Sequence, residues 1–143
     1  MNEHDVYLGN PNLKKANTQI EFTEEQIIEF LKCKEDPVYF ANNYMKIVSL
    51  DEGLVQFKPY DFQEKLINNF HENRFNICKM PRQTGKSTTS VSYLLHYCVF
   101  NDSVNIGILA NKAATARDLL GRLQTAYENL PKWMQQGIIS WNK

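Results

Sequence analysis

The second half of the chain alternates short apolar runs with helical patterns, and this order constrains the fold most strongly. An apolar run at 75–79 precedes a helix at 86–100, another at 104–110 precedes a helix from about 112 to 130, and a β-prone run spans 138–141. Strands joined in this way by helices pair in parallel through right-handed crossovers. The order therefore predicts an α/β fold built on a parallel sheet. The run VNIGILA at 104–110 is apolar enough for a central strand covered on both faces.

The first half of the chain predicts a helical and hairpin preface to that sheet. Each element has a local signal, such as a capping residue, a proline at a helix start or an acidic turn with glycine. In chain order we expect an extended arm at 1–21 and then a helix capped by Thr23 and Gln26, with an apolar face of Ile27, Ile28 and Leu31. A second helix starts at Asp36-Pro37. A hairpin that turns at Asp51–Gly53 and a helix over about 60–72 follow.

Composition and charge exclude several classes of protein. The 143 residues fit one domain, and 16 Lys+Arg balance 16 Asp+Glu, which argues against a generic nucleic-acid-coating protein but permits a local basic patch. The start lacks the apolar segment of a secretory leader, and the apolar stretch from Val91 to Phe100 is half of what a membrane span needs. Cys33, Cys78 and Cys98 are too few and too scattered for a disulfide framework or zinc site, and we expect Cys78 and Cys98 in the core.

The segment KMPRQTGKST, from Lys79 to Thr88, lies between a predicted strand and a predicted helix, as a phosphate-binding loop does. Gly85 would let the backbone approach phosphates, and the amides of the first helical turn would point at their oxygens. Lys86 would bridge the β- and γ-phosphates, the Ser87 hydroxyl would bind Mg²⁺, and Thr88 could hydrogen-bond the α-phosphate.

Two further side chains extend this interpretation. Arg82 can reach the γ-phosphate region and stabilise the charge that develops in phosphoryl transfer. Gln63 can offer a donor and an acceptor to the edge of adenine, with Tyr60 or Phe62 stacked on the base. Met80 stands where the pattern GxxxxGK[ST] has glycine. From the residues alone, an ordinary helix start and a surface arginine stay open as alternatives.

With these residues in place, the sequence resembles the N-terminal ATPase region of the large terminase subunit of tailed bacteriophages of the T-even type. The resemblance runs from about Leu8 to the end of the chain, and the loop of that family also carries arginine and lacks the leading glycine. The matching segments are Gly9–Lys14, Val38–Ala41, Tyr60-x-x-Gln63, Arg82–Ser87, Gly107–Ala110 and the ending from Pro131 through Gly137-Ile138 to Trp141-Asn142-Lys143.

The resemblance implies a P-loop NTPase (RecA/ASCE-like) fold with an incomplete parallel sheet, in which 22–143 is the N-terminal part of the ATPase domain. It implies a motor subunit that uses ATP and Mg²⁺ to package viral DNA into the capsid, in the host cytoplasm. Its partners would be double-stranded viral DNA, the portal protein, the small terminase subunit and further copies of itself. Arg82 and Lys86 would be catalytic, Ser87 would bind Mg²⁺, and the nucleotide would contact Gln63, Pro81, Arg82, Gln83, Thr84, Gly85, Lys86, Ser87 and Thr88.

The family's Asp-Glu strand and nuclease domain would lie beyond Lys143, so we expect this chain to bind nucleotide with negligible turnover. Lys112 and Arg117 follow the run at 104–110, where related ATPases often contact a nucleic-acid backbone, although solvated charges explain them equally well. Two alternatives stay open for the whole chain. One is a helicase-like ATPase, and the other is a non-enzymatic truncated reading frame that binds a partner through uncovered apolar surface.

Overall fold

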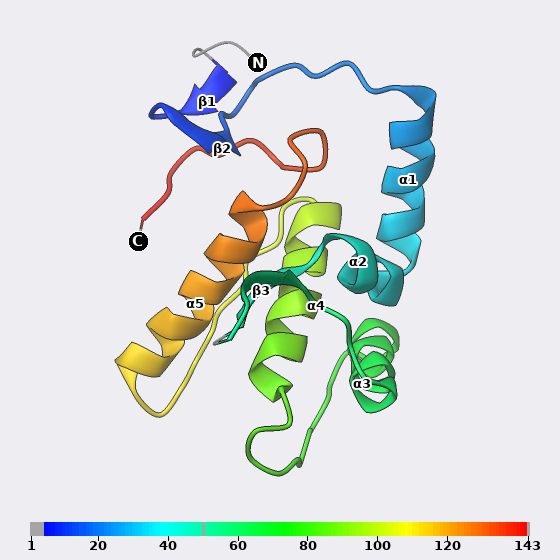
Figure 1. Ribbon diagram of the computed structural model, residues 1–143, viewed down its shortest axis with the longest axis vertical. Helices are drawn as coiled ribbons and strands as arrows, with labels where there is room; N and C mark the ends of the chain where they lie inside the picture. The colour runs from blue at the N-terminus through cyan, green and yellow to red at the C-terminus, as the bar shows by residue number, and fades with distance from the viewer. Residues whose placement is uncertain (1–4, 50, 143) are drawn as a thin grey trace.

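The computed structural model describes residues 5–49 and 51–142 as a helical body with two small antiparallel sheets. The elements are β1 (Val6–Tyr7), β2 (Asn10–Lys14), α1 (Glu24–Glu35), α2 (Pro37–Tyr44), β3 (Lys46–Ser49), β4 (Gly53–Gln56), α3 (Asp61–Glu72), α4 (Lys86–Phe100) and α5 (Ala113–Glu128). Helix α4 runs through the centre, with α5 on one side and α2 and α3 on the other (Figure 1). Among the described residues, no helix is long and apolar enough to cross a membrane.

The core is organised around α4. Its residues Val91, Leu95 and Val99 are buried and belong to one apolar cluster with Phe40 of α2 and Ile67 of α3. Burying a large apolar side chain contributes about 1.5–3 kcal/mol. Since α2, α3 and α5 all pack against it, α4 has a fixed position in the fold.

The predicted starts of the first two helices are confirmed, because both depend on local hydrogen bonds. The Thr23 hydroxyl accepts from the Gln26 amide at 3.2 Å, and the Gln26 side chain accepts from the Thr23 amide at 3.1 Å. At α2, one Asp36 carboxylate oxygen accepts from the amides of Val38 and Tyr39 at 2.9 and 2.8 Å. These bonds satisfy amides that have no acceptor inside their own helix.

The predicted apolar face of α1 is wrong. Ile27, Ile28 and Leu31 are exposed, and α1 faces the core with Phe30 and Cys33. The Phe30 ring lies 4.9 Å from that of Phe100, centroid to centroid. Residues 30 and 33 are neighbours on a helix surface, so this helix has two apolar stripes, and packing against α4 decides which one is buried.

The predicted hairpin is confirmed as β3 and β4, which pair antiparallel from Lys46 opposite Gln56 to Ser49 opposite Gly53. Gly53 has φ +73°, a conformation that glycine adopts at little cost. Leu50, the residue before the predicted turn, lies outside the described residues. Asp51 and Glu52 form the turn, as predicted.

The expected extended arm is a hairpin docked on the last part of the chain. The arm's residues 1–4, and Lys143 at the other end, lie outside the described residues. Leu13 of β2 is buried, and the buried Gln135 side chain donates to the Asn12 carbonyl and accepts from the Lys14 amide, both at 3.0 Å. The Ile138 amide donates to the Lys14 carbonyl at 2.8 Å. The hairpin of β1 and β2 and the segment 135–138 therefore lie together, in the upper part of Figure 1.

The predicted parallel sheet, and with it the P-loop NTPase fold class, is contradicted. The segments 75–79 and 104–110 are extended but pair with no strand among the described residues, and the predicted strand at 138–141 makes only an isolated parallel bridge between Lys15 and Ile138. Asn76 of the first segment and Asn105–Gly107 of the second line the same hollow beside α4, but no backbone hydrogen bond between described residues joins the two segments. The apolar pattern indicated extended backbone correctly, but a sheet requires neighbouring strands to accept and donate its hydrogen bonds.

Apolar side chains of these unpaired segments are exposed. Ile77 is 101% and Leu109 93% exposed, although both lie in runs that we predicted to be strands of a parallel sheet, the second of them covered on both faces. Cys78 and Cys98 are also exposed, which contradicts their expected place in the core, whereas Cys33 is buried. Burial, with a smaller effect of the Glu29 charge, raises the pKa of the Cys33 thiol to about 12.

His96 makes the stability of this fold depend on pH. Its ring is 2% exposed, and Nε2 lies 2.8 Å from the Cys33 carbonyl oxygen. Burial lowers the pKa of His96 to about 4 from an ordinary 6.5, against the opposing effect of that hydrogen bond. The unfolded chain therefore binds the proton first, so the stabilisation present above pH 6.5 is lost as the pH falls toward 4.

We expect the free energy of unfolding to fall by up to about 3 kcal/mol between pH 7 and pH 4 because of His96 alone. Urea unfolding of the wild type and of His96→Gln at several pH values measures this contribution as the difference between the two pH profiles. Parallel profiles would contradict it.

Candidate functional site

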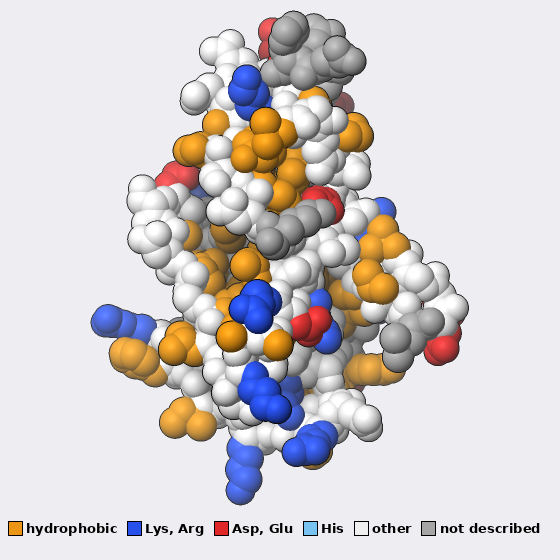
Figure 2. All heavy atoms as spheres, turned by 90° about the vertical axis from the view of Figure 1, so that its left-hand side faces the viewer, with side chains coloured by type: hydrophobic (Ala, Val, Ile, Leu, Met, Phe, Trp, Pro, Cys, Tyr) orange, Lys and Arg blue, Asp and Glu red, His pale blue; other side chains and the backbone are white. Residues whose placement is uncertain are grey.

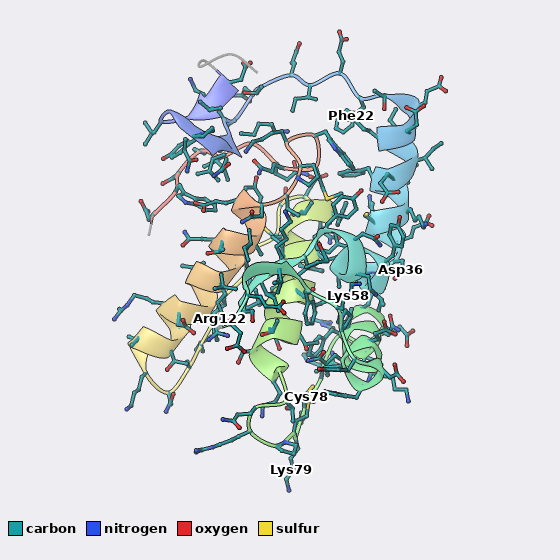
Figure 3. The ribbon with its side chains drawn as sticks, viewed as in Figure 1. Phe22, Asp36, Lys58, Cys78, Lys79 and Arg122 are labelled. Atoms are coloured by element: carbon teal, nitrogen blue, oxygen red, sulfur yellow. The ribbon has the colours of Figure 1, made fainter. Side chains whose placement is uncertain are left out.

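The loop that the sequence singled out ends in a left-handed turn at the start of α4. Gly85 is the N-cap of the helix, with φ +72° and ψ 17°, and Gln83 also has a positive φ of 61°. The Gly85 carbonyl accepts from the Thr89 amide at 2.9 Å and from the Thr89 hydroxyl at 3.0 Å. This segment lies at the lower end of Figure 3, where Cys78 and Lys79 are labelled at its start.

The amides of the first helical turn have no acceptor inside the helix. Within the part of the chain that the structure describes, the amides of Lys86, Ser87 and Thr88 make no other hydrogen bond. A helix of 15 residues also carries partial positive charge at its N-terminus. Free amides and positive potential together suit an anion at this position.

The Lys86 ammonium folds back over the loop. Nζ donates to the Met80 carbonyl at 2.9 Å and to the Pro81 carbonyl. A phosphate oxygen is a stronger acceptor than a neutral carbonyl, because the hydrogen bond is then assisted by charge on both sides. The lysine therefore lies at the loop in a position from which it can exchange carbonyls for phosphate.

Helix α3 is joined to the loop by Gln63. The Gln63 side chain is 4% exposed, and its Nε2 donates to the Thr84 carbonyl at 3.2 Å. Its Oε1 accepts from the Tyr60 amide at 3.0 Å. The structure thus brings together two residues, Gln63 and Thr84, that lie 21 positions apart in the sequence, and the chain pattern alone could not show this contact.

The rings beside Gln63 are exposed. Tyr60 is 71% and Phe62 45% exposed, and their rings lie parallel within 10° at a centroid distance of 5.9 Å. Flat aromatic surface next to the loop is available for stacking.

The other predicted site residues occupy the loop and the first turns of α4. Pro81, Arg82, Gln83 and Ser87 are exposed, and Arg82 makes no ion pair with any described residue. The Thr84 hydroxyl donates to the Pro81 carbonyl at 3.0 Å, so it is used inside the loop. Thr88 lines a hollow of about 620 Å³ between β3, α4 and α5. The exposed Ser87 hydroxyl is free to contact a ligand.

Positive charge gathers at this end of the molecule despite the neutral total. Arg74, Lys79, Arg82 and Lys86 follow one another without an acidic residue until Asp102. The space-filling view shows basic side chains over the lower half of the molecule (Figure 2), the end that holds the loop and the start of α5 in Figure 1. Lys112, Arg117 and Arg122 of that region are exposed, although Arg122 pairs with Asp118 at 2.9 Å.

The described residues contain no cluster of three or more His, Cys, Asp or Glu side chains that could hold a metal ion. Mg²⁺ that binds together with a nucleotide often uses the phosphates and few protein ligands, so it does not require such a cluster.

A second hollow of about 620 Å³ was not foreseen from the sequence. It lies between the end of α3, the middle of α4 and the extended segment 104–110, with Phe70, Tyr93, Tyr97 and Ile106 in its lining. In the sequence this hollow is indicated only by aromatic residues on α4, and a helix packed in a core shows the same pattern.

No family model matches the chain, so the interpretation of the site depends on its residues.

The Gly85 position offers a direct test of the loop geometry. A Cβ at residue 85 would overlap the Gln63 amide nitrogen, and the positive φ adds backbone strain, whereas Gly53 has nearly the same φ with open space around it. We expect Gly85→Ala to lower the free energy of unfolding by more than Gly53→Ala, the excess being about 1–3 kcal/mol from displacing the buried amide. Chemical denaturation measures both, and equal losses would exclude the close contact.

Proposed function

We propose that this chain binds ATP at the loop 81–88, as the ATP-binding part of a viral DNA-packaging motor of the terminase large-subunit type. The observation that carries the proposal is the hydrogen bond from Gln63 to the Thr84 carbonyl. The sequence assigned Gln63 to the nucleotide because it lies shortly before the loop. Its contact with Thr84 supports the proposal that α3 and the loop belong to one site.

The phosphates would lie at the N-terminus of α4. The amides of Lys86, Ser87 and Thr88 would donate to their oxygens, and the Lys86 ammonium would move from the Met80 and Pro81 carbonyls to the β- and γ-phosphates. The base would stack on the exposed ring of Tyr60. Mg²⁺ would supply charge neutralisation between the phosphates, with Ser87 as its ligand from the protein.

Arg82 would act on the γ-phosphate. Its guanidinium is exposed, extends from the same loop as Lys86 and has no ion pair among the described residues. A guanidinium stays charged at all relevant pH values and binds phosphate oxygens in pairs. The role in packaging DNA, with DNA, portal protein, small subunit and further copies as partners, comes from the resemblance of the sequence, and the basic end of the molecule is compatible with it.

Partner binding without catalysis is the second candidate. Phe75, Ile77 and Leu109 are largely exposed and lie on backbone that pairs with no strand among the described residues. Exposed extended backbone with apolar side chains is a common site for association with another chain. This candidate needs no nucleotide, so the measurement below separates the two.

We expect Lys86→Ala to weaken the binding of Mg·ATP by about 10- to 100-fold, because it removes a charge-assisted hydrogen bond to phosphate. Isothermal titration calorimetry of the full chain measures the dissociation constant. Lys34→Ala, which removes an exposed lysine from α1 at the far side of the molecule, is the matched control and should bind as the wild type does. If Lys86→Ala and the wild type bind Mg·ATP with equal affinity, the loop is not the nucleotide-binding site.

A further inference from the structure

The polar groups of Gln63 are engaged inside the protein. Oε1 accepts from the Tyr60 amide at 3.0 Å and Nε2 donates to the Thr84 carbonyl at 3.2 Å. Reading the edge of a base requires a donor and an acceptor that both face the ligand. With 4% of the residue exposed, Gln63 presents little of its amide to a nucleotide.

The same hydrogen bond orients the peptide between Thr84 and Gly85. The peptide is trans, so its carbonyl and its amide N–H point in opposite directions. Since Gln63 holds the Thr84 carbonyl toward α3, the Gly85 amide points away from α3. A side chain at residue 85 would occupy the place of the Gln63 amide nitrogen. The position of the Gln63 amide therefore requires glycine at residue 85.

We propose that Gln63 is a positioning residue for the phosphate loop and does not read the base, an inference that rests on the proposed nucleotide site. The site then binds nucleoside triphosphates mainly through their phosphates. The base contributes by stacking on Tyr60, whose ring is exposed and which tolerates any base. ATP and GTP should therefore bind with affinities within about tenfold of each other, since stacking alone distinguishes bases weakly.

Calorimetry with Mg·ATP, Mg·GTP and Mg·tripolyphosphate tests this, using the full chain as wild type and as Gln63→Met. Tripolyphosphate carries the phosphates without a base. Gln63→Met keeps the length of the side chain and removes both hydrogen bonds, so it should weaken all three ligands by a common factor of roughly ten. Gln56→Met is the matched control, because the Gln56 amide also donates to backbone carbonyls, of Ala41 and Met45, away from the loop. It should leave the three affinities unchanged.

If Gln63→Met binds ATP more weakly but binds tripolyphosphate as the wild type does, the inference is overturned, because Gln63 would then contact the base. A preference of the wild type for ATP over GTP by 100-fold or more would overturn it too, and that comparison requires no variant to fold. These results would leave the proposed nucleotide site intact. Wild-type protein that binds none of the three ligands would instead contradict the proposed function, and the inference with it.

Discussion

The packing of α4 between three other helices is the constraint on which the rest of the structure depends. Val91, Leu95 and Val99 fix one face of α4 against α2 and α3, and α5 covers another side. A helix held in this way has an N-terminus at a defined place. The position of this N-terminus also determines where the loop, its free amides and the Lys86 ammonium lie. The proposed site therefore depends on apolar packing in the core, some distance from the loop.

The second requirement is the relation between α3 and α4. Leu66 and Ile67 are buried on α3, and one turn earlier on the same helix lies Gln63, which reaches the loop. Apolar packing thus brings the glutamine within hydrogen-bonding distance of Thr84. Because the loop backbone depends on this contact, a change in the α3–α4 interface would alter the site without touching any residue that would contact the ligand.

Local interactions made much of the fold predictable from the sequence. Thr23, Asp36 and the Gly53 turn determine their own backbone through bonds to near neighbours, and each appears where expected. The sequence predicted a parallel sheet that the described residues do not form, because strand pairing depends on partners far along the chain. Ile77 and Leu109 have the pattern of buried strands and yet lie exposed. In the site, the sequence indicated the loop first and Gln63 from its position ahead of the loop, and only the structure shows the hydrogen bond from the Gln63 amide to the Thr84 carbonyl.

The proposed site requires that an anion binds to the free amides at the start of α4. Amide chemical shifts of the ¹⁵N-labelled full chain, followed as Mg·ATP is added, test it most directly. We expect the amide signals of Gly85, Lys86 and Ser87 to shift together and to saturate with one dissociation constant, while the signal of Gly137, at the opposite end of the molecule, does not move. Shifts confined to the aromatic hollow around Tyr93 and Tyr97, or none at all, would contradict it.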